Sequence, residues 1–94
     1  MSDGARASVQ VDTPEARVTE WRLPPGSAIG PHRHEHDYVV VPMTDSVMTV
    51  ISAAGAAQNP VKTGQSYFRK AGVEHDVRND TVDEIVFVEI EIKR

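Results

Sequence analysis

Residues 32–41 read HRHEHDYVVV, and this stretch decides how the fold of the chain is interpreted. It holds three of the four histidines and runs directly into β-branched residues, which are typical of a strand. Because alternate side chains of a strand point the same way, the three histidines are predicted to share one face. Neighbouring imidazoles on that face would stand about 7 Å apart, close enough to bind one metal ion together. The face comprises His32, His34, His36 and Tyr38.

The fourth histidine is His75, which lies in the segment GVEHDV of residues 72–77. Imidazole nitrogen is a ligand of zinc, iron, nickel and copper. Two histidines from one strand and a third from another would form an open site, with positions left for water or substrate. The spacing alone leaves an alternative, in which clustered surface histidines only titrate.

The composition indicates one small acidic domain without covalent cross-links. The chain has 94 residues, a formal net charge of −4 and no cysteine. The lack of cysteine excludes disulfides and thiolate ligands, and the charge argues against a nucleic-acid partner. No segment resembles a signal peptide or a membrane span, so a cytoplasmic protein is expected. Residues 1–7 are predicted to be disordered and residues 8–94 to form a single domain.

The remaining pattern is that of short strands separated by turns. Alternating or β-branched segments predict strands, and clusters of Gly, Pro, Asn and Asp predict the turns between them. Residues 44–46 are predicted to form a hairpin turn, and the alanine-rich residues 53–60 a loop. No segment has a sustained helical period, so an all-β sandwich or barrel is expected. The predicted strands cover residues 8–12, 17–23, 38–41, 47–51, 66–69, 73–78 and 84–92.

Residues 26–45 resemble the first conserved motif of the cupin family. That motif runs Gly, five residues, His-x-His, three or four residues, Glu, six residues, Gly. In this chain it begins at Gly26, and its two histidines are His32 and His34. Tyr38 stands where the family has its carboxylate. Asp45 replaces the last glycine, which is a mild exchange because both residues fit a turn.

Residues 64–79 resemble the second cupin motif, which runs Gly, five residues, Pro-x-Gly, two residues, His, three residues, Asn. Every position from Gly64 through His75 to Asn79 matches, except that Lys70 replaces the proline. With two motifs in the right order, the chain is similar to a small single-domain cupin. The resemblance implies an all-β fold, a cupin jelly-roll barrel of six to eight strands, extending over residues 8–94.

The resemblance also implies one divalent metal ion per chain, held at the mouth of the barrel by His32, His34 and His75. The usual carboxylate ligand is missing, because Tyr38 is a poor ligand while its phenol, with an ordinary pKa near 10, is protonated. If four residues follow His34 instead of three, the position of the carboxylate ligand falls on Val39, which cannot coordinate a metal ion. Three neutral ligands leave the charge of the ion uncompensated, which favours an anionic small-molecule ligand. The metal stays open among Fe, Zn, Ni, Mn and Cu.

Two further residues are candidates for chemistry at this site. His36 shares the predicted face of the ligands and would replace the missing carboxylate; the alternative is a histidine at the rim of the barrel. His36 and Tyr38 are also the candidates for a catalytic base. Asp37 is a candidate hydrogen-bond partner of a ligand. The acidic neighbours are otherwise expected to lie in solvent: Glu35, Asp37, Glu74 and Asp76.

Three segments narrow the resemblance within the cupins: HDYVVVP at 36–42, SYFR at 66–69 and GVEH at 72–75. They resemble a group of small cupins labelled as β-alanine degradation proteins, which implies a pathway and no particular reaction. Three functions remain open. The first is a metal-dependent enzyme, such as an oxygenase or isomerase, acting on a small polar metabolite. The others are a non-catalytic module that binds a small molecule or a metal, and a structural β-barrel dimer with a vestigial pocket.

A homodimer is expected from two features of the predicted strands. Residues 8–12 would form an edge strand able to cross to a second chain. The last strand has a wholly apolar face that requires cover, and a second copy of the chain would supply it. That face consists of Val86, Val88, Ile90 and Ile92.

Overall fold

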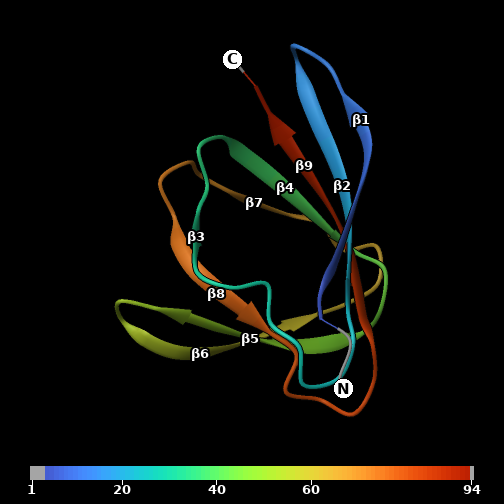
Figure 1. Cartoon of the computed structure of the whole chain (residues 1–94), viewed down its shortest axis with the longest axis vertical. Helices are drawn as coiled ribbons and strands as arrows, with labels where there is room; N and C mark the ends of the chain where they lie inside the picture. The colour runs from blue at the N-terminus through green and yellow to red at the C-terminus, as the bar shows by residue number, and fades with distance from the viewer. Residues whose placement is uncertain (1–3, 94) are drawn as a thin grey trace.

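The computed structural model describes residues 4–93, which form nine β-strands and no helix. The strands make two antiparallel sheets that enclose the core between them, so the predicted all-β jelly-roll fold is confirmed (Figure 1). No helix within the described range is long and apolar enough to cross a membrane. The strands are β1 (Arg6–Asp12), β2 (Ala16–Leu23), β3 (His32–Arg33), β4 (Asp37–Pro42), β5 (Ser46–Ser52), β6 (Gly55–Val61), β7 (Tyr67–Arg69), β8 (Glu74–Arg78) and β9 (Ile85–Ile92).

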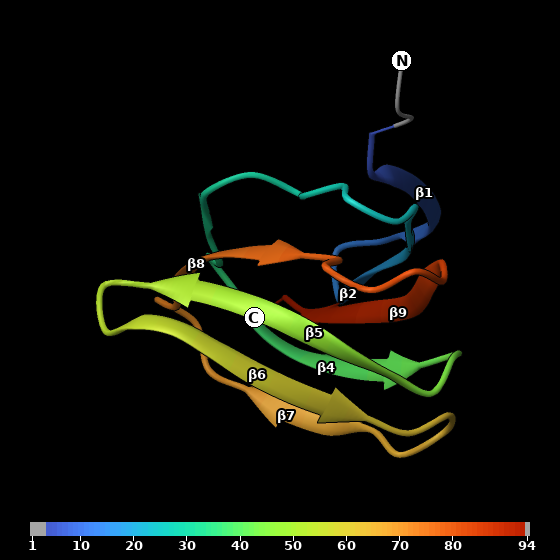
Figure 2. The ribbon, with the colours of Figure 1, turned by 90° about the horizontal axis from the view of Figure 1, so that it is seen from below.

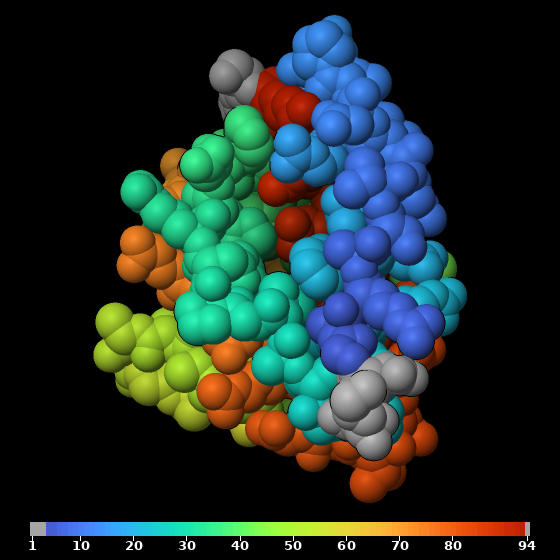
Figure 3. Space-filling model, viewed as in Figure 1, coloured from blue at the N-terminus to red at the C-terminus, as the bar shows by residue number. Residues whose placement is uncertain are grey.

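The five-stranded sheet has the order β1-β2-β9-β4-β7, and the four-stranded sheet has the order β3-β8-β5-β6. In the first sheet, β9 is central and pairs along its whole length with β2, from Ile85 opposite Leu23 to Ile92 opposite Ala16. Seen from below, β5 and β6 lie nearest the viewer with β4 and β9 behind them (Figure 2). On the face shown in Figure 3, a hollow separates the teal segment around β3 from the red strand β9.

The core lies between the sheets because the strands alternate as their sequences predict. In β4 the side chains of Tyr38, Val40 and Pro42 are buried, while the residues between them are only partly covered. Leu23 and Ile85, which are opposite each other in β2 and β9, are completely buried. Burial of these apolar side chains is the main favourable contribution to the folding free energy of so small a protein. The buried cluster consists of Leu23, Tyr38, Val40, Met48, Val61, Val77, Ile85 and Phe87.

The prediction of a loop over residues 53–60 is wrong, because β6 occupies residues 55–61. β6 pairs with β5 from Gly55 opposite Ser52 to Val61 opposite Ser46. Alanine, glycine and asparagine have low strand propensity, so local sequence does not predict this strand. β6 lies at the edge of its sheet, where a residue such as Pro60 is tolerated, and tertiary pairing determines its conformation.

The prediction of a hairpin at residues 44–46 is also wrong. β4 and β5, which flank these residues, belong to different sheets and do not pair. The segment is instead a crossover between sheets, and the Asp45 carboxylate fixes it by accepting a hydrogen bond from Thr63 N at 2.8 Å. A turn signal specifies a reversal of the chain but not the strand with which the next segment pairs.

The single strand expected from His32 onward is divided in two. β3 ends at Arg33, and residues 34–36 carry the chain from the four-stranded sheet to β4 of the other sheet. At the N-terminus, β1 begins at Arg6, so residues 6 and 7 are ordered by pairing with β2 and the disorder predicted for them is wrong. Residues 1–3 of that predicted segment lie outside the described residues.

Candidate metal centre

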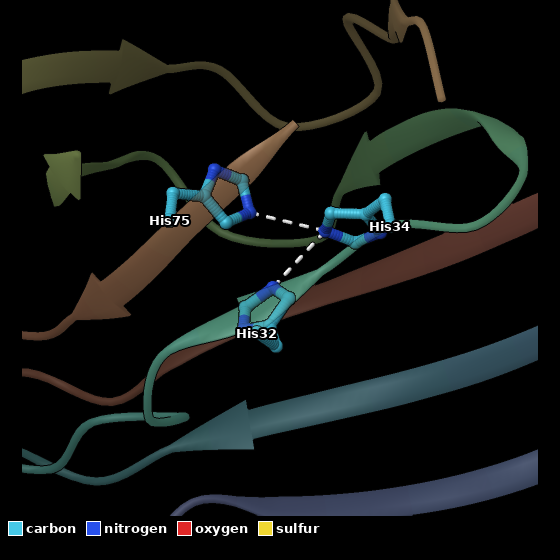
Figure 4. Close-up of side chains that lie close together, drawn as sticks. All are labelled: His32, His34 and His75. Carbon is cyan, nitrogen blue, oxygen red and sulfur yellow. Dashed lines mark hydrogen bonds between the residues drawn. The ribbon is translucent and has the colours of Figure 1, made fainter. Parts of the chain in front are cut away.

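The structure brings together three of the four histidines at one end of the barrel. His32 on β3 and His75 on β8 are directly opposite each other in the ladder that joins these strands. His34 follows the end of β3, and its ring is buried. All three turn their Nε2 atoms toward one another (Figure 4). The predicted set of three histidines is therefore a cluster in space.

The spacing of the Nε2 atoms fits a shared ion. His34 Nε2 lies 3.0 Å from His32 Nε2 and 3.0 Å from His75 Nε2. With metal–nitrogen bonds of about 2.1 Å, two ligands at a right angle stand about 3.0 Å apart, whereas tetrahedral ligands stand roughly 3.4 Å apart. The two measured separations therefore match ligands at a right angle better than tetrahedral ligands, and all three ligand atoms lie within 4.8 Å of one another.

The hydrogen-bonding capacity of the rings also favours a cation. His32 Nδ1 lies 2.7 Å from the Gly30 carbonyl oxygen, which can only accept, so Nδ1 carries the proton and Nε2 of the neutral ring presents a lone pair. His34 Nε2 can hold one proton at most, so it cannot donate to both of its nitrogen neighbours. A metal ion would satisfy all three lone pairs at once.

His34 and His75 are neutral at physiological pH, as metal ligands must be. Burial, followed by the charges of His32 and His75, lowers the pKa of His34 to about 4. Burial is also the main cause that lowers the pKa of His75 to about 4, and the charge of His32 adds to it. Because His34 is uncharged at pH 7, its 4.0 Å approach to Glu89 is not an ion pair in the metal-free protein.

Asp76 positions His32 through the backbone, although the sequence predicted that this carboxylate lies in solvent. Asp76 is buried, and its Oδ1 accepts a hydrogen bond from Gly30 N at 2.9 Å. The carbonyl of the same glycine accepts the bond from His32 Nδ1. Arg78 donates to the other oxygen of Asp76 at 3.1 Å. This chain of contacts fixes the ring orientation and tautomer of His32.

His34 is held by the backbone and by Tyr38. Its amide donates to the Val73 carbonyl at 2.9 Å, and its carbonyl accepts from Gly72 N at 2.8 Å. The ring stacks on Tyr38 with 3.9 Å between centroids and 20° between planes. Burial, with the charge of Glu89 next, raises the pKa of Tyr38 to about 12. The phenol is therefore protonated at neutral pH, and stacking is the contact that Tyr38 makes with the cluster.

Glu89 is a functional candidate that the sequence reasoning missed. Its side chain is 13% exposed, and Oε1 lies 4.0 Å from His34 Nδ1, on the opposite side of the ring from the converging Nε2 atoms. The neglected signal was the period of β9: Glu89 lies on the same face as Ile85 and Phe87, which are core residues. The wholly apolar face of β9 predicts packing alone, whereas the opposite face carries a carboxyl group that faces the barrel.

The other candidates lie outside the cluster. His36 is in the bend between β3 and β4, and it belongs to neither group of potential metal ligands found within residues 4–93. Asp37 accepts a hydrogen bond from Ala71 N at 2.9 Å, a contact with the turn between β7 and β8. Glu91, on the same face of β9 as Glu89, forms an ion pair with Arg17 at 3.2 Å.

A cavity of about 300 Å³ lies between the sheets and reaches the cluster through His32 and His75. Polar groups on its wall include Tyr67, Arg69 and Glu89. The rest of its lining is largely apolar, which is the usual character of a small-molecule site. The apolar side chains are Ile29, Val40, Met48, Val50, Val77 and Phe87, with Ala57 beside them.

Glu89 gives the metal-free protein a pH-dependent stability. Burial, with the charge of Glu91, raises the pKa of Glu89 from 4.5 to about 7, so the folded state holds this proton more tightly than the unfolded state. Its contribution is fully present below pH 4.5 and is lost as the pH rises to 7, by up to about 3 kcal/mol at about 1.4 kcal/mol for each unit of pKa. Glu89→Gln removes this term. We therefore expect the variant to gain stability relative to wild type across this window.

The measurement is the free energy of unfolding by urea of both metal-free proteins between pH 4 and pH 8. His34 and His75 act in the opposite direction, since their lowered pKa values give stability that is lost as the pH falls from 6.5 to 4. Both proteins contain these histidines, so the difference between the two curves isolates Glu89. Parallel curves would show that Glu89 does not titrate in this range.

Comparison with known proteins supports the fold and the family. The sequence matches the family described as the cupin domain over residues 19–91. It is 56% identical over 86 residues to the β-alanine degradation protein BauB of Pseudomonas aeruginosa, covering 92% of this chain and 90% of that protein. The resemblance to small cupins of that group is thus confirmed. The chain belongs to the cupin domain family.

Solved structures show the same fold. A cupin domain from Bordetella pertussis superposes with a TM-score of 0.95 at 49% identity, covering 97% of this chain and 95% of that one. A protein with a double-stranded β-helix domain from Klebsiella pneumoniae has a TM-score of 0.79 at 20% identity, covering 98% of this chain and 79% of that one. At that identity the second likeness concerns the fold alone.

Proposed function

We propose that this protein is a metal-binding cupin that acts on a small polar, anionic metabolite. His32, His34 and His75 would hold one divalent ion through their Nε2 atoms, without the carboxylate that the cupin motif usually provides. The observation that carries the proposal is the convergence of three imidazoles, because His34 Nε2 lies 3.0 Å from Nε2 of both His32 and His75, and the latter two residues line a cavity. A bound ion would supply Lewis-acid or redox chemistry at this position.

The residues around the cluster have separate tasks in this proposal. Asp76 and Gly30 orient His32, and the stacked ring of Tyr38 supports His34. Glu89 is the carboxyl group that faces the cavity, which makes it the candidate for proton transfer to or from a bound ligand. The name of BauB supports a ligand among small metabolites such as β-alanine and its products.

The metal content of the protein, purified without added metal and measured by elemental analysis, tests the proposal. We expect about one ion per chain. The ion-loaded protein is then incubated with β-alanine, propionate and other short carboxylates while oxygen uptake and product formation are followed. Turnover of one compound would establish an enzyme. Binding without turnover would establish the alternative function, a non-catalytic binding module. A protein that takes up no metal under any condition would contradict both.

We also propose a homodimer, with residues 8–94 of each chain forming one cupin domain. The outward side chains of β9 continue into apolar neighbours on both sides, since Ile90 lies between Val18 of β2 and Val39 of β4. Every residue of β1 is exposed, with Val9 at 58% and Val11 at 43%. A second chain that covers these surfaces would remove apolar area from water.

Sedimentation equilibrium at micromolar concentration checks the dimer. We expect the mass of two chains for wild type and of one chain for Ile90→Lys, because the new charge would be buried at the centre of the apolar face. Val82→Lys is the matched control, since Val82 is an exposed apolar residue in the turn before β9. A wild-type monomer, or a dimer of Ile90→Lys as stable as that of wild type, would contradict this interface.

A further inference from the structure

Arg69 is a cation placed on the wall of the cavity by the register of β7. In the pairing of β7 with β4, Arg69 is opposite Tyr38, whose ring is buried inside the barrel. Directly opposed residues of a ladder share a face, so Arg69 and Tyr67 turn inward. Phe68, between them, is 46% exposed on the other face of the sheet. The exposed guanidinium therefore lies at the opening of the cavity.

The guanidinium packs on an aromatic ring and has no acidic partner among residues 4–93. Its Cζ lies 4.5 Å from the centroid of the Tyr67 ring, and Nη1 donates to the carbonyl oxygen of the preceding residue at 2.9 Å. Within the described part of the chain, no carboxylate lies at ion-pair distance from Arg69. By contrast, Arg17, Arg22 and Arg78 each pair with an acidic side chain. Several N–H donors of Arg69 are thus available to a ligand.

The charge of Arg69 acts on the groups that line the same cavity. After burial and larger charge effects, the charge of Arg69 contributes to the lowered pKa of His75, and it opposes the rise in the pKa of Tyr38. The cation is therefore within electrostatic reach of the three-histidine centre. A ligand could contact both, since the cavity that holds His32, His75 and Arg69 on its wall has a volume of about 300 Å³.

The chemistry of this wall defines a class of ligand. A planar guanidinium held by stacking matches the two oxygens of a carboxylate, with which it forms paired charge-assisted hydrogen bonds. The wall of the same cavity includes Val40 and Met48, whose apolar side chains suit a short carbon chain. The volume lies at the lower end for ligand sites, so the molecule is small.

We propose that Arg69 is the residue that binds the carboxylate of the ligand, and that the ligand is a short aliphatic carboxylate whose other end reaches the three-histidine centre. This inference deepens the proposed function and rests on it for the far end of the ligand. The contact between Arg69 and the carboxylate requires no metal. Arg69 is thus a specificity-determining residue, which separates acids from amides and alcohols of the same size.

Calorimetric titration with propionate and with propionamide, which has a similar shape but no charge, tests the proposal. Each compound is titrated into cobalt-loaded and metal-free samples of wild type, Arg69→Gln and Arg33→Gln. Arg33 is the matched control, because it is an exposed arginine on β3 that does not line this cavity. We expect propionate to bind wild type and Arg33→Gln alike, and to bind Arg69→Gln roughly 10- to 100-fold more weakly. Arg69→Lys, which keeps the charge without the planar fork, should be intermediate.

Three results would overturn the role of Arg69: equal binding of propionate by Arg69→Gln and wild type, equal binding of propionamide and propionate by wild type, or no binding of propionate by wild type. Elemental analysis of the same samples separates this inference from the proposed function. Metal-free protein that binds propionate through Arg69 but takes up no cobalt would refute the metal site and leave the carboxylate site standing. Equal cobalt content in all variants would show that the loss concerns the carboxylate alone.

Discussion

Replacing His75 by alanine is expected to abolish stoichiometric metal binding. The variant keeps His32 and His34 but loses one of the three Nε2 atoms that converge within 3.0 Å of a neighbour. Loss of a residue that only orients a metal ligand typically costs 10- to 100-fold in affinity, so loss of a ligand should cost more than about a hundredfold. Elemental analysis after gel filtration should give about one ion per wild-type chain and almost none in His75→Ala.

His36→Ala is the control for this experiment. It removes an imidazole from the same short stretch of sequence, but one that lies outside the cluster, so it should leave the metal content unchanged. The fold of His75→Ala should survive, because the ladder between β3 and β8 uses backbone groups, and circular dichroism of the metal-free proteins checks this. Retention of the ion by His75→Ala, or its loss from His36→Ala, would contradict the assignment of ligands.

The second large effect is expected at Asn79, where alanine should destabilise the fold by about 3 kcal/mol. Asn79 is completely buried, and its Nδ2 donates to the carbonyls of Leu23 and Asp83, both at 2.7 Å. Its Oδ1 accepts from the amide and hydroxyl of Thr81. Truncation leaves these groups without their partner, and each buried unsatisfied polar group costs about 1–3 kcal/mol. The side chain thus joins the end of β2 to the turn before β9.

Urea unfolding of the metal-free proteins measures this effect. Asn79→Asp tests the mechanism, because it keeps the size of the side chain but replaces both N–H donors by an acceptor, so it should be destabilised to a similar degree. Asp80→Ala, at an exposed position in the same turn, should change the unfolding free energy by less than about 0.5 kcal/mol. A loss below about 1 kcal/mol in Asn79→Ala would show that water replaces its hydrogen bonds.

Most of the strands could be predicted because the alternation of apolar residues in their sequences matches the alternation of buried and exposed positions in the sheets. Residues 84–92 alternate between apolar and mixed positions, and β9 occupies residues 85–92 of them. β6 could not be predicted, since its alanines and Pro60 have no intrinsic strand preference and only pairing with β5 orders them. The wrong hairpin at residues 44–46 has a similar origin: a turn sequence does not specify which sheet receives the next strand.

The cluster of histidines could be predicted from the spacing of two motifs, whereas its surroundings could not. Glu89 and Arg69 come from β9 and β7, and neither lies in a stretch that suggests chemistry. Their place on the cavity wall depends on which face of each strand turns inward, and on the pairing of both strands with β4. Such long-range register is a property of the assembled barrel and is not encoded in any single segment.

The pairing of His32 with His75 has a mechanical consequence. The two positions are 43 residues apart in the chain (75 − 32), and β3, which carries the first of them, contributes only two residues to the ladder. An ion held by both would act as a reversible cross-link in a protein that has no cysteine, closing a long loop whose entropy otherwise favours opening. Release of the ion and detachment of β3 would then be one event, and the rate at which a chelator removes the metal would report the opening of the barrel mouth.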